Sequence, residues 1–357
     1  MTTHDDIRFG VLLSTDRYAD ESDGDVLART VEVARFAEEL GLDDLWLTEH
    51  HFLGASVNPS ALGLAAYLLG KTHTVHVGTA VTVLPLHSPV HVAEQTALLD
   101  QLSGGRFVLG VGRGFPGVEY DVIGPGLASW RAGLAEPLDL TLATLNGEVT
   151  TGIAHGLPAP LRPSPAVRSL PRPPVYVAAG SPATTELAAD RGLPLLLFYD
   201  KGPEAKAQMV AHYDARARAG GRPAPPWGHA FAVFTQVTES AERARRLMGN
   251  RARFILSLNN DPSRLAARPE SVPPPVSPES VGTLTDRLLG TQPVGSVETC
   301  VERLVRHVSV SGCRRVMCQV EAAEKTGDVL RNLERLATEV FPAVRRAVGA
   351  VPGRGAV

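Results

Sequence analysis

Short apolar segments alternate with amphipathic helical segments along almost the whole chain of 357 residues. The first pair is typical: residues 7–14, "IRFGVLLS", predict a buried strand, and residues 26–42 carry apolar side chains every three or four positions and end near Gly41. Eight strands are expected, at residues 7–14, 43–51, 75–85, 106–114, 173–180, 193–200, 229–237 and 314–322. This alternation predicts an α/β fold with a parallel sheet, and eight repeats predict a (β/α)8 TIM barrel in a single domain, residues 1–357.

An open, doubly wound sheet is the alternative fold. That fold usually carries a glycine-rich turn after its first strand, whereas this chain has "STDRYADESDGD" there. Two proline-rich segments interrupt the repeats. Residues 148–174 are expected to form an insertion loop after the fourth strand and its helix, itself expected over about 127–145. Residues 261–280 follow the helix expected at 240–256, and they fit either a lid over the barrel mouth or a flexible insertion.

Composition excludes several classes of function. The net charge of −3 favours neither nucleic acid nor an anionic membrane as a partner. No apolar run is long enough to span a bilayer, and the first ten residues lack the pattern of a signal peptide. The three cysteines, Cys300, Cys313 and Cys318, suit neither a disulfide framework nor a zinc site. A cytoplasmic protein with reduced thiols is therefore expected.

In such a barrel the chemistry lies where the strands end, at their carboxyl termini. The fifth strand ends at "GSPATTE", where Ser181 is expected to cap a helix whose free amides and the hydroxyl of Thr184 favour a phosphate, although a simple helix cap explains the pattern equally. The fourth strand ends in "GRG", which leaves Arg113 free to reach across the mouth. Arginine binds phosphate through two hydrogen bonds, so Arg113 and this helix terminus together predict a phosphate clamp.

The second strand ends in Glu49, His50 and His51. A metal site would need further ligands from other strand ends, and those ends offer no histidine; His87 and His91 flank a loop and a helix, where surface positions are commoner. No metal is therefore expected. A histidine here is better suited to acid/base chemistry or hydrogen bonding near neutral pH.

Several segments together resemble the bacterial luciferase-like flavin-dependent monooxygenases. They are "FAEELGLDDLWLTEHHF", "VHVGTAVTVLPLHSPVHVAEQTALLDQLSGGRFVLGVGRG", "PVYVAAGSPATTELAADRGLP" and "PVGSVETCVERL", in the same order and at matching spacing. The resemblance implies a barrel that binds reduced FMN at its mouth. Oxygen then adds to the flavin, and the resulting peroxyflavin oxidises a small organic substrate. A separate flavin reductase would supply the reduced FMN, because no nicotinamide-binding motif is visible.

The resemblance also implies roles for individual residues. His50 matches the family's catalytic histidine, with His51 supporting it and Glu49 orienting groups near the flavin. Ala80 and Val81 match a pair whose unusual peptide bond supports the flavin ring. The phosphate binders correspond to Arg113, Ser181 and Thr184, beside Gly180, and a second flavin-side arginine corresponds to Arg131. The substrate-pocket wall is expected to include Phe115, Pro116, Phe198 and Tyr199.

Three departures from the family pattern qualify the resemblance. Gly112 stands where the light-emitting members carry a reactive cysteine, Gly180 replaces an acidic residue, and the loop after the seventh strand is shorter and proline-rich. All three put light emission and a long-chain aldehyde substrate in doubt, and tailoring of a natural product is one alternative role. A deazaflavin-dependent hydride-transfer enzyme and a non-catalytic flavin-binding protein also stay open. The family usually forms dimers through helices near residues 88–101, so a homodimer is expected, although Val92, Leu98 and Leu99 in that segment fit ordinary barrel packing equally.

Overall fold

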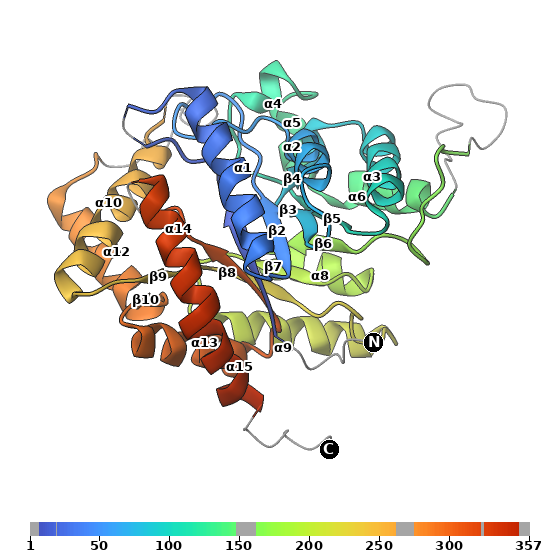
Figure 1. Cartoon of the computed structure of the whole chain (residues 1–357). Helices are drawn as coiled ribbons and strands as arrows, with labels where there is room; N and C mark the ends of the chain where they lie inside the picture. Colours follow the sequence, from blue (N-terminus) through green and yellow to red (C-terminus); the bar gives the residue numbers. More distant parts are fainter. Residues whose placement is uncertain (1–6, 19, 148–161, 262–274, 323–324, 350–357) are drawn as a thin grey trace.

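The computed structural model describes residues 7–18, 20–147, 162–261, 275–322 and 325–349. At its centre, eight parallel strands form a closed ring, which confirms the predicted barrel (Figure 1). In chain order the strands are β1 (Arg8–Leu13), β2 (Asp44–Leu47), β3 (His76–Thr79), β5 (Phe107–Gly112), β6 (Val175–Ala178), β7 (Leu195–Leu197), β8 (Ala230–Phe234) and β11 (Arg315–Gln319). Pairing of β11 with β1 closes the ring, and β4 (Thr82–Val83) extends the third strand towards the mouth.

Small residues allow the strands to curve tightly around a filled interior. A Cβ atom on Gly78 would lie 2.7 Å from the ring of Trp46, which is fully buried inside the barrel. A Cβ atom on Gly110 would lie 1.9 Å from the carbonyl oxygen of Thr79. Glycine is therefore required at both positions, because the packed interior leaves no room for a side chain.

Helices surround the ring and bury their apolar faces against its outer surface. They are α1 (Asp23–Glu39), α2 (Ala61–Leu69), α3 (Pro89–Ser103), α6 (Ala135–Leu145), α8 (Pro182–Asp190), α9 (Pro203–Ala219), α13 (Val297–Ser311), and α14 (Thr326–Arg335), which continues through η2 (Leu336–Val340) into α15 (Phe341–Gly349). Serine caps begin α1, α2, α3, α8 and α13, each accepting a hydrogen bond from a first-turn amide. Within the described ranges, no helix combines the length and apolar composition needed to cross a membrane.

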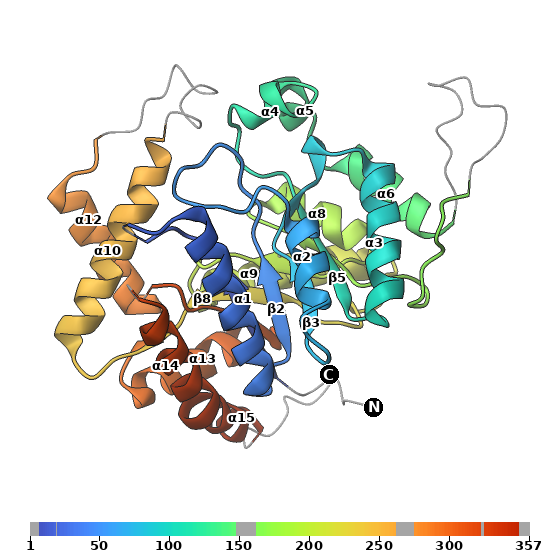
Figure 2. The ribbon, with the colours of Figure 1, turned by 45° about the horizontal axis from the view of Figure 1, so that its top comes forward.

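One predicted helix is split in the structure, and another is confirmed but lies beside the barrel. The helix expected over about 127–145 is two helices, α5 (Leu127–Ala132) and α6, because Gly133 adopts a positive φ of 94° between them and Pro137 fits the first turn of α6. The helix expected at 240–256, α10 (Ala241–Asn259), packs against α12 (Pro278–Thr291) beside the barrel (Figure 2). The ring is covered there by α13, which contacts α9 and α15.

Short elements complete the structure around the mouth. They are η1 (Leu84–Leu86), α4 (Glu119–Val122), and the paired strands β9 (Gln236–Val237) and β10 (Val294–Gly295). Residues 162–174 of the expected insertion contain no helix or strand, while 148–161 lie outside the described residues. Most of the expected lid, 262–274, also lies outside them, and its last residues begin α12.

Candidate active site

A cavity of about 490 Å³ opens at the carboxyl ends of the strands. Eleven of the predicted site residues line it: Glu49, His50, His51, Ala80, Val81, Arg113, Phe115, Gly180, Ser181, Thr184 and Phe198. Three do not line it. Pro116 is buried, Tyr199 packs between Phe198 and Phe234, and Arg131 is exposed on α5.

Arg113 is held in place by aromatic residues from the loop after β5. Its guanidinium carbon lies 4.0 Å from the centre of the Trp130 ring, and its Nη1 lies 3.5 Å from the Trp130 carbonyl oxygen. The Trp130 indole donates a hydrogen bond of 3.3 Å to the carbonyl of Gly114, and the Tyr120 hydroxyl donates to the carbonyl of Arg113. This stacking restricts the guanidinium while leaving donors available for an anion.

The amino terminus of α8 faces the same cavity. Ser181 is its N-cap and Pro182 its first residue, as predicted. The Ser181 hydroxyl accepts a hydrogen bond from the amide of Thr184, and the amides of Gly180 and Ser181 donate to the Thr184 hydroxyl, at 3.3 and 3.2 Å. Ser181 is exposed, so a ligand can reach its hydroxyl group at this helix terminus. A helix terminus with hydroxyl groups, facing a guanidinium, provides the donors that a phosphate requires.

The inner part of the cavity is apolar. It is lined by Leu12, Leu196, Ala232 and Met317 from the barrel interior. The Ala80–Val81 peptide bond beside them is cis, in agreement with the unusual peptide expected there. Gly112 lies close to this pair, since a Cβ atom on it would lie 2.7 Å from Cγ2 of Val81 and 3.3 Å from Cβ of Ala178. A cysteine at position 112 would therefore displace Val81.

Glu49 is almost fully buried at the cavity wall and joins three segments. Its Oε2 accepts a hydrogen bond from the amide of Ala61 at the start of α2, and its Oε1 accepts one from the amide of Val83 in β4, both at 3.1 Å. The Nε2 of His87 lies 2.8 Å from Oε1, and that of His51 lies 3.5 Å away. Burial raises the pKa of Glu49, but contacts with His51, His87 and the backbone outweigh it and hold the pKa at about 2.

His87 is a hydrogen-bond partner of the buried Glu49, which the sequence analysis did not predict. Sequence reasoning favours a surface position for His87, whereas its side chain is only 28% exposed and its hydrogen bond to Glu49 raises its pKa. The ligand atoms of Glu49, His51 and His87 lie within 4.8 Å of one another, a spacing that a metal ion could also accept. The proximity of residues 49 and 87 depends on the barrel, and the sequence offers only the "PLHSP" turn as a signal.

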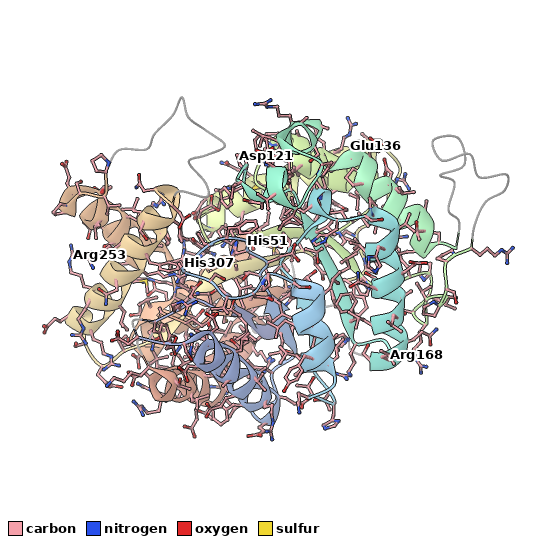
Figure 3. All side chains as sticks on the ribbon, turned by 90° about the horizontal axis from the view of Figure 1, so that it is seen from above. His51, Asp121, Glu136, Arg168, Arg253 and His307 are labelled. Atoms are coloured by element: carbon pink, nitrogen blue, oxygen red, sulfur yellow. The ribbon has the colours of Figure 1, made fainter. Side chains whose placement is uncertain are left out.

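His50 and His51 begin a loop that curls back over the mouth. The amide of His50 donates to the carbonyl of Asn58, and the side-chain amide of Asn58 donates to the carbonyl of Thr48, at 3.0 and 2.6 Å. Phe52 adopts a positive φ of 55° and is 54% exposed. Figure 3, seen from above, places His51 near the middle of the molecule and Arg253 of α10 at its edge.

A second polar cluster at the ends of β1 and β11 was also missed. The buried guanidinium of Arg29 pairs with Glu321 at 2.8 Å, and Arg251 of α10 pairs with Asp16. The Ser14 hydroxyl oxygen lies 2.9 Å from an oxygen of each carboxylate, and its single proton can be donated to one of them at a time. Burial raises the pKa of Glu321, as does Asp16. The Arg251–Asp16 pair connects α10 to the loop after β1, and none of the residues in this cluster lines the cavity.

Comparison with known proteins decides the family. The family model described as "Luciferase-like monooxygenase" matches residues 7–314. The chain belongs to this family. Among sequence relatives of the luciferase-like chain, the alkanal monooxygenase alpha chain of Photorhabdus luminescens is 28% identical over 376 residues, covering 94% of this chain and 97% of the relative.

Solved structures share the fold of this luciferase-like chain. Monooxygenase RslO1 from Streptomyces bottropensis has a TM-score of 0.75 and 21% identity, covering 94% of this chain and 99% of its own. The oxygenating constituent of 3,6-diketocamphane monooxygenase from Pseudomonas putida, in complex with FMN, has a TM-score of 0.72 and 17% identity, with 94% and 98% covered. An F420-dependent secondary alcohol dehydrogenase has a TM-score of 0.70 and 19% identity, with 95% and 99% covered.

Proposed function

We propose that this protein is an FMN-dependent monooxygenase that uses reduced FMN and O2 to oxygenate a small organic substrate. The observation that carries the proposal is the single cavity that joins Arg113 and the α8 terminus to an apolar interior and to His50 and His51. The first two groups suit the phosphate of FMN, and the apolar interior suits its ring. Bound reduced flavin would supply the electrons for activating oxygen.

The residues of the chain would then divide the remaining tasks. Arg113, Ser181, Thr184 and the adjoining backbone of Gly180 would hold the phosphate, and Ala80 and Val81 would support the ring. His50, with His51 beside it, would exchange a proton with the reacting groups. Phe115 and Phe198, which are 52% and 46% exposed at the mouth, would contact the organic substrate and exclude water.

The proposal includes a flavin reductase as a transient partner and a cytoplasmic location. The P. putida relative is named as an oxygenating constituent, which supports a two-component system. It also includes a homodimer formed through α3. Val92 and Leu99 of this helix are buried against the barrel, whereas Leu98 and Leu102 are 45% and 75% exposed. Adjacent exposed leucines one helical turn apart suit a subunit interface.

A deazaflavin-dependent hydride-transfer enzyme is the second candidate. The F420-dependent alcohol dehydrogenase has nearly the same TM-score as the FMN complex, and both cofactors carry a phosphate that such a clamp would bind. The two candidates differ in their requirement for oxygen, because hydride transfer needs none. For the monooxygenase, a natural-product intermediate is one substrate class that would suit the apolar inner part of the cavity.

Anaerobic titration separates these candidates. The purified protein is mixed with reduced FMN or with reduced F420, and tight binding of FMN with oxygen uptake after air is admitted supports the monooxygenase. Binding of F420 without oxygen uptake would favour hydride transfer. A third outcome is flavin binding without turnover of any substrate, with the same flavin affinity and the same lack of turnover in His50→Ala. That outcome would indicate a non-catalytic flavin-binding protein.

A further inference from the structure

One carboxylate oxygen at the cavity wall serves two histidines. Oε1 of Glu49 lies 2.8 Å from Nε2 of His87 and 3.5 Å from Nε2 of His51. The first distance is a hydrogen bond, and the second is a longer electrostatic contact. The side chain of Glu49 is 1% exposed, that of His51 9% and that of His87 28%. Glu49 therefore lies between His87, whose ring is partly solvated, and His51, whose ring lines the cavity.

The charge of Glu49 determines which nitrogen atoms carry protons. Its pKa of about 2 keeps the carboxylate ionised at every pH at which the protein would work. An ionised carboxylate accepts hydrogen bonds and donates none. A ring nitrogen that faces it with a lone pair would be repelled, so Nε2 of each histidine carries a proton.

The position of that proton decides what His51 can do. A neutral imidazole carries one proton, so a proton on Nε2 leaves the lone pair on Nδ1. We propose that Glu49 and His87 are positioning residues that keep a proton on Nε2 of His51 and leave its Nδ1 as the atom able to accept a proton. The consequence for turnover rests on the proposed monooxygenase function.

His87 completes the arrangement from the solvent side. Its hydrogen bond occupies Oε1 and raises its own pKa, so the ring is a cation over a wider pH range and offsets the buried negative charge. The His51 and His87 rings have their centres 6.5 Å apart, with Glu49 as the charged group between them. A cationic His87 limits how strongly Glu49 attracts the proton of His51.

A metal ion held by the same three residues is the competing interpretation. It would require a lone pair on Nε2 of both histidines, which is the opposite proton arrangement. Glu49 Oε1 already accepts the hydrogen bond from the amide of Val83, and Oε2 accepts the one from Ala61. Each oxygen of Glu49 thus already uses one lone pair on a backbone amide, which leaves fewer positions for a metal ion.

Nitrogen NMR of the flavin-free, full-length protein tests the proposal. The protein is labelled with 15N-histidine, and the His51 signals are assigned from their loss in His51→Gln. At pH 8 we expect Nε2 of His51 to be protonated and Nδ1 to carry the lone pair. Glu49→Gln should increase the Nδ1-protonated share at least about twofold, because the fixed anion is lost. A wild-type proton on Nδ1, or an unchanged distribution in Glu49→Gln, would overturn the proposal.

A second variant keeps the test decisive if Glu49→Gln does not fold. His87→Ala removes the shorter of the two histidine contacts with Oε1, so the Nε2 proton of His51 should move downfield, and an unchanged shift would overturn the proposal. His212→Ala is the matched control and should leave this shift unchanged, since His212 makes a similar 2.9 Å contact with Glu186 on the surface. Histidine shifts that change on addition of EDTA would show a metal site and also overturn it. Failure to bind FMN would overturn the proposed function alone.

Discussion

The guanidinium of Arg113 stacks on the ring of Trp130, with 4.0 Å between the guanidinium carbon and the ring centre. Trp130 lies on α5, so a short helix above the mouth positions the arginine of the expected phosphate clamp. This relationship makes α5 part of the site, although Trp130 does not itself line the cavity.

Arg113→Ala should raise the dissociation constant of reduced FMN about 10- to 100-fold, because charge-assisted hydrogen bonds to the phosphate are lost. Trp130→Ala should raise it about 3- to 30-fold through loss of the stacking. Anaerobic fluorescence titration measures both constants. Arg131→Ala is the comparison, since Arg131 is exposed on the same helix and should cause a smaller loss than Arg113→Ala. Equal affinity in Arg113→Ala and the wild type would contradict the clamp.

Gly112→Ala should lower both FMN affinity and the free energy of unfolding, the latter by about 1–3 kcal/mol, because the new methyl group meets Val81 at 2.7 Å. Gly54→Ala is the matched control, since a Cβ atom there has no neighbouring atom within 4 Å and Gly54 does not line the cavity. That control should change the unfolding free energy by less than about 0.5 kcal/mol. Urea denaturation and flavin titration of both variants measure the two quantities. Unchanged unfolding free energy and FMN affinity in Gly112→Ala would contradict the close packing.

Lys206 should make the free energy of unfolding depend on pH above about pH 7. Its ammonium group is buried between Ala232 and His307, and burial lowers its pKa from 10.5 to about 7. The unfolded chain therefore binds more protons between pH 7 and 10.5, so the free energy of unfolding contributed by this residue rises with pH across that interval.

Lys206→Met should remove this slope. The free energy of unfolding of the wild type relative to Lys206→Met should increase by about 2–3 kcal/mol between pH 7 and 9.5. Urea denaturation at the two pH values measures the change. Lys71→Met, at an exposed lysine, should show no such slope. A constant difference between wild type and Lys206→Met would mean that the buried amine is not neutral near pH 8.

The proposed homodimer predicts that Leu98→Glu combined with Leu102→Glu gives a monomer. Two charges placed on the exposed face of α3 would be buried without partners in an interface. Sedimentation velocity measures the mass. Val310→Glu on α13 adds one charge at a similarly exposed position, 40%, and should leave the oligomer intact. A monomeric wild type would refute the dimer directly.

Much of the fold could be predicted from the sequence because local patterns determine it. The eight apolar strands and the cap at Ser181 depend on neighbouring residues, and the structure confirms them. No helix was predicted at α13, although Cys300, Leu304 and Val308 give it a helical apolar pattern. The position of α10 beside the ring depends on its partner α12, which no local pattern in α10 reveals.

The candidate site divides in the same way. Glu49, Arg113 and Ser181 lie at strand ends, so the barrel rule brings them together without further information. The supports of these residues could not be predicted, since Trp130 and His87 meet them only through loops. Whether a strand-end residue lines the cavity also depends on how each loop turns, and Tyr199 turns towards Phe234 while its neighbour Phe198 faces the mouth.

The cavity draws the expected cofactor-binding groups and part of its apolar lining from different stretches of the chain. The residues of the expected phosphate clamp and the histidines come from β2 to α8, whereas Phe198, Ala232 and Met317 follow later in the chain. Helices α10 and α12 lie in this later stretch, and Arg251 of α10 pairs with Asp16 in the loop after β1. Evolution could therefore exchange the later loops and diversify substrates while inheriting the same cofactor-handling half, and grafting experiments between relatives should respect the boundary after α8.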